Sequence, residues 1–250
     1  MPTFPNGQLL AEAVNFQGHS GDWISGYLAR PLWRQDLPAV VVLHHRNGLD
    51  AETEEITRNF AAHGYLALCP NLHHREERNA SITEAAEALI TAGGVPDDRC
   101  LGDVTGAVTY LRNLPTANGK LGVIGYCAGG RQAYLVACQL PLDAAVVCYG
   151  GNIVAGPDKL TERKPVAPVD MTATLSCPLL SLSGRNDTHP SPAEIAIMGQ
   201  ALEAHGKLHE IHIYEDTGHA FFAVERPSYQ PVSATDGWHR VFDWFGKFLG

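Results

Sequence analysis

Hydrophobic residues gather along this chain in short runs, most of them bounded by Gly, Pro, Asn or Asp. Most runs are rich in Val, Ile or Leu, a pattern typical of strands that are buried on both faces of a parallel sheet. The pattern predicts strands at residues 39–43, 65–69, 121–124, 144–148, 178–182 and 211–214.

Stretches with helical patterning separate these runs, and strand and helix alternate along most of the chain. That alternation predicts an α/β fold, in which a doubly wound, mostly parallel sheet carries helices on both faces. The first thirty residues differ, and residues 9–16 and 23–29 are predicted as an antiparallel pair at the sheet edge. The predicted helices are residues 52–63, 99–112, 128–137, 191–205 and 236–249.

The chain has no internal repeat, low-complexity tract or linker, so residues 1–250 are predicted to form a single domain. Residues 159–173, which include Pro165 and Pro168, show no clear period. They are either a surface excursion near the functional site or a long connection.

Charge and targeting features narrow the partners of the protein. The formal net charge is −9, which argues against nucleic acid and anionic membrane surfaces as partners. No run of eighteen apolar residues occurs, and residues 1–6 lack the regions of a signal peptide. We therefore expect a cytoplasmic protein with no membrane partner; the sequence leaves a homodimer open.

The six cysteines are scattered without a CxxC pair, which favours reduced thiols over a metal cluster or a disulfide framework. The adjacent pairs His44-His45 and His73-His74 suggest a metal site. Neighbouring residues on a strand point to opposite faces, however, so neither pair chelates simply. No metal and no cofactor are expected.

The strongest local signal is Gly125-Tyr126-Cys127-Ala128-Gly129, which lies between a predicted strand and a predicted helix. This is the nucleophile-elbow pattern, with cysteine where serine usually stands. The start of a helix beneath the sulfur favours thiolate, and the amide of Ala128 is placed to hold an oxyanion. By itself the pentapeptide also fits a glycine-rich turn with an inert core cysteine.

Two later residues occur where an α/β-hydrolase has the partners of its nucleophile. Asp187 follows the strand at 178–182, and His219 follows the strand at 211–214, so nucleophile, acid and histidine occur in the chain order of α/β-hydrolases. Each lies after the carboxyl end of its strand, where open α/β sheets bind ligands. Asp170 and Asp216 compete for the role of the acid, and Asp187 is favoured because it follows a strand directly and precedes a capped helix.

Acyl-transfer chemistry assigns the roles. Cys127 attacks a carbonyl as thiolate, His219 holds or shuttles the proton, and Asp187 fixes the imidazole tautomer. The second oxyanion donor is expected from the loop around His45 and Arg46, by analogy with hydrolase geometry.

These residues resemble the dienelactone hydrolase (carboxymethylenebutenolidase) family over nearly the whole chain. The resemblance implies an α/β-hydrolase fold, a metal-free cysteine triad, and hydrolysis of a cyclic enol ester or another small lactone or ester. The motifs that carry it are residues 44–49, 64–72, 125–130, Asn186-Asp187 and 218–222.

The chain departs from the family at two positions. His45 stands where members usually carry a glutamate, so its imidazole either pairs with the thiolate, donates to the substrate carbonyl, or only packs. Ala223 stands where the type member has a carboxylate-binding arginine, and Arg226 lies three residues further. His45, Tyr126, Phe221 and Arg226 are candidates for lining the substrate pocket or tuning the nucleophile.

Three functions remain open on the sequence alone. The first is a cysteine hydrolase of small carboxylic esters or lactones. The second is the same triad acting on thioesters or phosphate triesters, because an elbow does not fix the acyl group. The third is a catalytically silent protein that binds small molecules.

Overall fold

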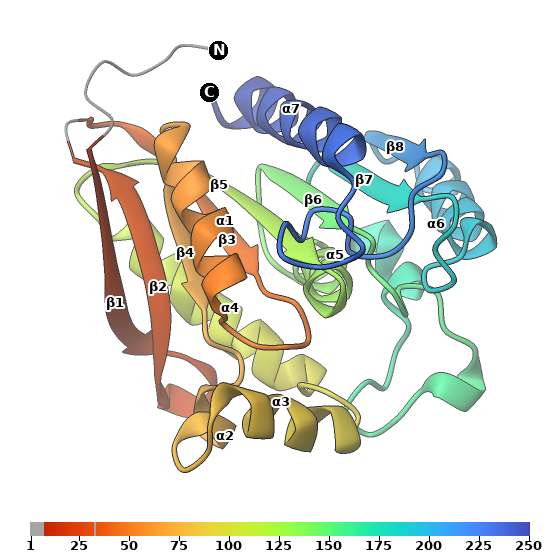
Figure 1. Ribbon diagram of the computed structural model, residues 1–250, viewed down its shortest axis with the longest axis horizontal. Coiled ribbons are helices and arrows are strands. Elements are labelled where there is room, and N and C mark those ends of the chain that lie inside the picture. The colour runs from red at the N-terminus through yellow and green to blue at the C-terminus, as the bar shows by residue number, and fades with distance from the viewer. Residues whose placement is uncertain (1–7, 33) are drawn as a thin grey trace.

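The computed structural model describes residues 8–32 and 34–250. Its centre is an eight-stranded sheet in the order β1-β2-β4-β3-β5-β6-β7-β8 (Figure 1). β1 pairs antiparallel with β2, and β2 antiparallel with β4, while all other neighbours are parallel. The strands are β1 (Leu9–Gln17), β2 (Trp23–Pro31), β3 (Leu37–Leu43), β4 (Leu66–Pro70), β5 (Ala117–Tyr126), β6 (Ala144–Cys148), β7 (Leu179–Gly184) and β8 (His209–Tyr214).

All predicted strands occur within four residues of their expected bounds, so the predicted fold class is confirmed. The predicted helices are also present, although the last begins at Pro231 rather than near residue 236. A short helix at His74–Glu77 and one at Ile82–Thr91 were not predicted. The helices are α1 (Ala51–Ala62), α2 (His74–Glu77), α3 (Ile82–Thr91), α4 (Asp97–Arg112), α5 (Ala128–Gln139), α6 (Pro192–Ala204) and α7 (Pro231–Leu249).

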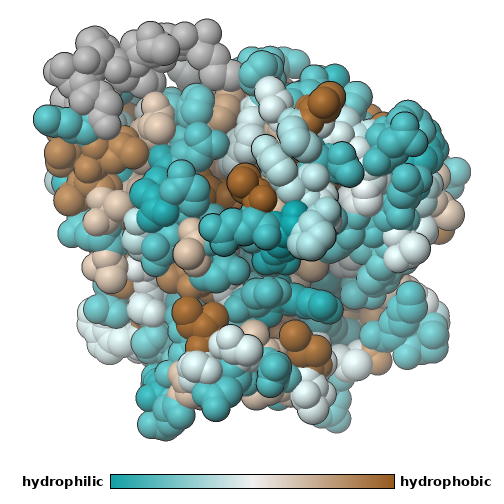
Figure 2. Space-filling view, in the orientation of Figure 1, coloured by the Kyte–Doolittle hydropathy of each residue, from teal (hydrophilic) through white to brown (hydrophobic). Residues whose placement is uncertain are grey.

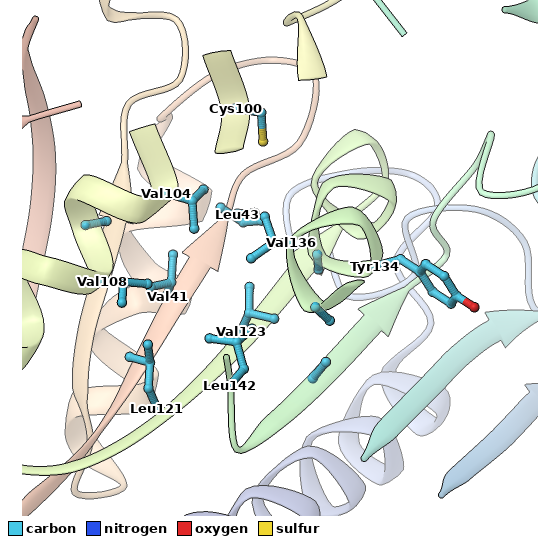
Figure 3. Packing of buried hydrophobic residues seen from close by; sticks show 14 of the residues in the cluster. Val41, Leu43, Cys100, Val104, Val108, Leu121, Val123, Tyr134, Val136 and Leu142 are labelled. Carbon is cyan, nitrogen blue, oxygen red and sulfur yellow. The ribbon is translucent and has the colours of Figure 1, made fainter. Parts of the chain in front are cut away.

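Alternate residues of the central strands enter two hydrophobic clusters, one on each face of the sheet. Val41 belongs to the cluster that α4, α5 and α6 cover, whereas Val40 and Val42 belong to the cluster that α1 and α7 cover. Figure 3 shows Val104 and Val108 of α4 facing Val41. Because side chains alternate along a strand, burial on both faces explains why these runs are continuously apolar.

The carboxyl ends of the parallel strands lie along one side of the sheet, and the candidate residues lie next to these ends. β3 leads into His45, β5 into Cys127, β7 into Asp187 and β8 into His219. Residues that are far apart in the sequence therefore lie close together in space, as expected for an open α/β sheet.

The irregular segment between β6 and β7 is an excursion beside the site. It contains two 3-10 helices, η2 (Pro157–Lys159) and η3 (Pro168–Thr174). The Asp97 amide at the start of α4 donates to the Arg163 carbonyl at 2.8 Å, which holds the excursion against the N-terminus of this helix. Of the two interpretations of this segment, the structure selects the surface excursion near the site.

The surface face in Figure 2 is mostly hydrophilic, with scattered hydrophobic patches. Among the described helices, none is long and apolar enough to cross a membrane.

Candidate active site

Cys127 lies at a sharp turn between β5 and α5. Its φ of 56° and ψ of −115° fall in a region that side-chain-bearing residues rarely adopt. The Cys127 amide donates to the carbonyl of Cys148 at 3.0 Å, which anchors the turn to β6. The Cys127 side chain is therefore at the N-cap of α5, just beyond the carboxyl end of β5.

Glycines permit this turn because neighbouring backbone leaves no room for side chains. A Cβ on Gly125 would lie 1.9 Å from the carbonyl oxygen of Gly129. A Cβ on Gly129 would lie 2.2 Å from the Leu43 oxygen, so the first turn of α5 packs directly on the end of β3. The glycines of the elbow motif are thus explained by close approach of backbone.

His219 and Asp187 form the second part of the site. His219 Nδ1 lies 2.7 Å from Asp187 Oδ2, and the other oxygen of Asp187 accepts the His189 amide at 2.8 Å. Asp187 is buried, whereas the competing Asp170 and Asp216 are exposed. The predicted pairing of acid and histidine is therefore found with Asp187.

The thiol and the two imidazoles beside it change one another's titration. Burial alone would raise the pKa of Cys127, but the neighbouring imidazoles of His219 and then His45 outweigh it and lower the pKa to about 5. Burial would lower the pKa of His219, but the Asp187 carboxylate and then the Cys127 thiol raise it to about 9. Thiolate and imidazolium are the favoured forms near neutral pH.

The other five thiols of the chain contrast with Cys127. All six cysteines are free, and Cys127 alone is not fully buried. Burial raises the pKa of Cys138 and Cys177 to about 12, and it raises the pKa of the others as well. These five behave as small hydrophobic side chains. The remaining three are Cys69, Cys100 and Cys148.

His45 is 1% exposed and contacts a carboxylate that the sequence did not predict at the site. Glu52 Oε1 lies 3.4 Å from His45 Nε2. Burial opposes a charge on His45, but the neighbouring Cys127 thiol and then the Glu52 carboxylate raise its pKa. Glu52 lies in the first turn of α1, where an acidic residue is ordinarily explained by the helix dipole.

Two tyrosine rings pack against the His45 imidazole and against each other. Tyr126 lies with its ring centre 5.6 Å from that of His45, and Tyr149 lies 6.0 Å from it on a nearly parallel plane. Tyr149 also meets the ring of His219 edge-on at 5.0 Å. Tyr126 was a predicted candidate, whereas Tyr149, which directly follows β6, was not.

The side chains of Arg226 and Phe221, both candidates for the substrate pocket, contact other parts of the site instead of lining a pocket. The Arg226 Nε donates to Glu52 Oε2 at 3.1 Å, so the guanidinium holds the carboxylate that faces His45. Phe221 is fully buried and packs edge-on against Tyr149 at 5.3 Å. Phe221 thus supports the rings behind the site rather than lining an open pocket.

A hollow of about 540 Å³, part of it open solvent, lies beside the elbow. His45, Arg46 and Ala128 line it together, so the structure brings the predicted oxyanion residues to one place. Ala128 is the first residue of α5, where an amide has no partner within the helix. Lys164 of the excursion and Gln132 of α5 also line this hollow, and neither was predicted.

The two members of each adjacent histidine pair have different neighbours in the structure. His44 meets His73 at a ring separation of 4.8 Å, and burial lowers the pKa of His44 to about 4 and that of His73 to about 3. The His44 Nε2 accepts a hydrogen bond from the amide of Leu72 at 3.2 Å. In the part of the chain that the structure describes, no group of three or more His, Cys, Asp and Glu side chains could hold a metal ion.

The sheet order, the elbow and the positions after β7 and β8 define an α/β-hydrolase. Residues 24–249 match the model of the dienelactone hydrolase family, and the chain belongs to this family. It is accordingly a hydrolase of ester bonds, as the sequence predicted.

Relatives support the assignment. A Salmonella typhimurium (strain LT2) protein named "Putative carboxymethylenebutenolidase" is 36% identical over 98% of this chain and 90% of its own length. A Bradyrhizobium protein named "Probable 2-oxo-3-(5-oxofuran-2-ylidene)propanoate lactonase" is 30% identical over 90% of this chain and 89% of its own.

Among solved structures, a "Putative Dienelactone Hydrolase" from Klebsiella pneumoniae superposes with a TM-score of 0.87 at 31% identity, covering 96% of this chain and all of that one. A dienelactone-hydrolase-like promiscuous phosphotriesterase from metagenomic libraries has a TM-score of 0.79 at 18% identity, with 98% and 100% coverage. At that identity the second likeness supports the fold alone.

Replacing Gly125 by alanine should destabilise the protein by several kcal/mol, because the new Cβ meets backbone at 1.9 Å. Urea unfolding measures the change. Gly246→Ala is the control, since a Cβ added to this helical glycine would meet no atom within 4 Å, and alanine favours helix. Equal stability of Gly125→Ala and Gly246→Ala would contradict the account of the elbow.

Iodoacetamide should label Cys127 first, without substrate, because its pKa of about 5 makes it a thiolate near neutral pH. Peptide mass spectrometry over a pH series gives the rate at each thiol. The Cys127 rate should stay level on acidification until about pH 5 and then fall, as the thiolate is protonated. A half-point near the ordinary thiol value of about 8.5 would contradict this electrostatic description.

Proposed function

We propose that this protein hydrolyses small lactones or carboxylic esters through a Cys127–His219–Asp187 triad and an acyl-enzyme. The observation that carries the proposal is the 2.7 Å contact between His219 Nδ1 and Asp187 Oδ2, with the Cys127 thiol of the strained elbow close enough to help raise the pKa of His219. Nucleophile, proton carrier and orienting acid then stand in the order that covalent catalysis requires.

In the acylation step the Cys127 sulfur attacks the carbonyl carbon, a sulfur–carbon bond forms, and the carbonyl electrons move onto oxygen. The amide of Ala128 and the loop at His45 and Arg46 stabilise this oxyanion. When the oxyanion collapses, the carbon–oxygen bond breaks and the leaving oxygen takes a proton from His219. In a lactone the leaving oxygen stays attached to the acyl group.

In the deacylation step a water molecule attacks the thioester carbon and gives a proton to His219. Collapse of the second oxyanion breaks the sulfur–carbon bond and returns Cys127 as thiolate beside a protonated His219. Asp187 stays ionised throughout and keeps the imidazole in one tautomer. The site is thereby restored, and one water has been consumed.

His45 is the second imidazole partner of the resting thiolate in this proposal. Its contact with Glu52 and its raised pKa favour imidazolium beside the sulfur, although burial opposes that charge. A glutamate at this position would repel the thiolate, whereas an imidazolium attracts it. The alternative is that position 45 contributes only its backbone to the oxyanion hole.

The substrate class follows from the relatives. Their names specify a carboxymethylenebutenolide and a furanone-derived lactone, both cyclic esters. We propose the same general class for this chain, acted on in the cytoplasm, where the six free cysteines would stay reduced.

Replacing Cys127 by alanine should abolish hydrolysis of 4-nitrophenyl acetate and of simple lactones, since no other side chain stands at the elbow. Cys127→Ser should be poor, because a hydroxyl needs a stronger base than a thiol. Turnover is followed by release of nitrophenol, with circular dichroism as the check on folding. Full activity of folded Cys127→Ala would overturn the proposed function.

Asp187→Asn should lower kcat by orders of magnitude, because an amide in place of the carboxylate favours the wrong imidazole tautomer. Asp216→Asn is the matched control, since Asp216 is exposed and its φ of 52° suits asparagine. Steady-state kinetics on one ester compares the two variants. A larger loss in Asp216→Asn would show that the acid is misassigned.

His45→Glu should slow alkylation of Cys127 and move the half-point of its pH profile upward, because a carboxylate then faces the thiolate. His45→Gln should act in the same direction but less strongly. The control is His205→Glu, an identical change at an exposed position after α6. Profiles identical to the parent would leave only the backbone role for position 45.

A further inference from the structure

β8 forms one edge of the sheet, at the end opposite to β1 (Figure 1). It pairs with β7 on one side, and within residues 8–32 and 34–250 no strand pairs with its other side. Every residue of β6 and β7 is buried, whereas in β8 only Tyr214 is buried. The outer side of β8 is therefore accessible to another chain.

The backbone of β8 offers hydrogen-bonding groups to such a chain. The carbonyls of Leu208 and Tyr214 accept amides from the β7 side. Because backbone groups point to alternate sides along a strand, those of the odd-numbered residues His209, Ile211 and Ile213 point outward. No amide or carbonyl in the described part of the chain bonds to these outward groups.

Hydrogen bonding restricts how two copies of β8 can pair. In an antiparallel ladder the outward residues of one strand face the outward residues of the other. A two-fold axis makes the interface isologous, so each contact occurs twice. An axis at Ile211 puts Ile211 opposite itself and His209 opposite Ile213 of the second copy. An axis at Glu210 or at His212 satisfies the same backbone groups, so the side chains select the register.

Side-chain charge selects the axis at Ile211. That axis places Glu210 opposite His212 of the second copy, and the pair occurs twice. An axis at Glu210 would oppose two carboxylates, and an axis at His212 would oppose two imidazoles. Opposite charges on facing residues stabilise a ladder, and like charges destabilise it. Lys207 and Glu215, which flank β8, come to the same end of this ladder, again with opposite signs.

The surroundings of His212 suit a carboxylate opposite it. His212 Nε2 lies 4.0 Å from Asp236 Oδ2, an oxygen that also accepts hydrogen bonds from Tyr214 and Arg240. Burial and then Arg240 lower the pKa of His212, and a second carboxylate would counter both effects. Glu210 is exposed, and no cation of the described residues forms an ion pair with it.

Apolar residues also find partners in this register. Leu208, which directly precedes β8, is 56% exposed and would face Tyr214 of the second copy. On the other face of the ladder the half-buried Ile211 would meet Ile211 of the second copy. The opposite edge strand, β1, has a single charged residue, Glu12, so it lacks this self-complementary pattern.

We propose that two copies of this chain associate through β8, antiparallel about a two-fold axis at Ile211, so that their sheets join into one. The turn after β8 leads to His219, so the ladder lies next to the segment that carries this candidate residue. Cys127 takes no part in the association, which is therefore independent of the proposed function.

Sedimentation equilibrium of the full chain tests the association, and the parent protein should show a concentration-dependent dimer. His212→Glu should weaken the dimer about tenfold, because it places two carboxylates opposite each other at two positions. Adding Glu210→Lys to His212→Glu should restore the dimer, because lysine then faces glutamate. The control is Glu12→Lys on β1, which should leave the dimer unchanged. Circular dichroism checks that each variant is folded.

Several results would overturn this interface. The parent protein could be a monomer, or its dimer could be unaffected by His212→Glu. Glu12→Lys could weaken the dimer as much as His212→Glu does, which would show that the effect does not belong to β8. The double variant could associate no more tightly than His212→Glu, which would show that Glu210 and His212 do not face each other.

Crosslinking checks the register without relying on charge. Directly opposed residues at a hydrogen-bonded position have Cα atoms about 5.5 Å apart, within the range of a disulfide. In the Cys127→Ala protein, whose other five thiols are buried, Ile211→Cys should give a crosslinked dimer on mild oxidation. Ile213→Cys is the matched control, because its two copies would lie four residues, about 14 Å, apart along the ladder. Failure of Ile211→Cys to crosslink, or equal crosslinking of Ile213→Cys, would overturn the register.

Discussion

The strained backbone at Cys127 is the constraint on which the rest of the site depends. A φ of 56° at a residue with a side chain is unfavourable, and it persists because neighbouring backbone fixes it. The amide of Cys127 is held by Cys148, while Gly125 and Gly129 let α5 pack directly on the end of β3. The turn aims the sulfur past the sheet edge, where the loops after β3, β7 and β8 converge.

Charge alternation around the sulfur follows from that placement. Asp187 faces His219 on one side of Cys127, and Glu52 faces His45 on the other, with Arg226 behind Glu52. With Cys127 and both imidazoles charged, three anions and three cations lie in this chain of contacts. A partly buried thiolate is tolerable because its charge is balanced mainly by neighbouring side chains rather than by solvent.

The sequence predicted the sheet and the Cys127, Asp187 and His219 geometry because each depends on a local pattern, an apolar strand followed by a turn. Glu52 escaped prediction because its role arises from a tertiary contact with His45. Phe221 lies next but one to His219, yet its side chain points into the core. Sequence proximity to a catalytic candidate does not determine which way a side chain points.

The central claim is that Cys127 carries the acyl group during turnover. Rapid mixing with 4-nitrophenyl acetate, acid quenching and peptide mass spectrometry would test it directly, with Asp187→Asn used to slow deacylation. The account predicts an acetyl group on the peptide that contains Cys127, appearing with the first equivalent of nitrophenol and lost on hydrolysis. Continued turnover with acetyl on another residue, or on none, would contradict it.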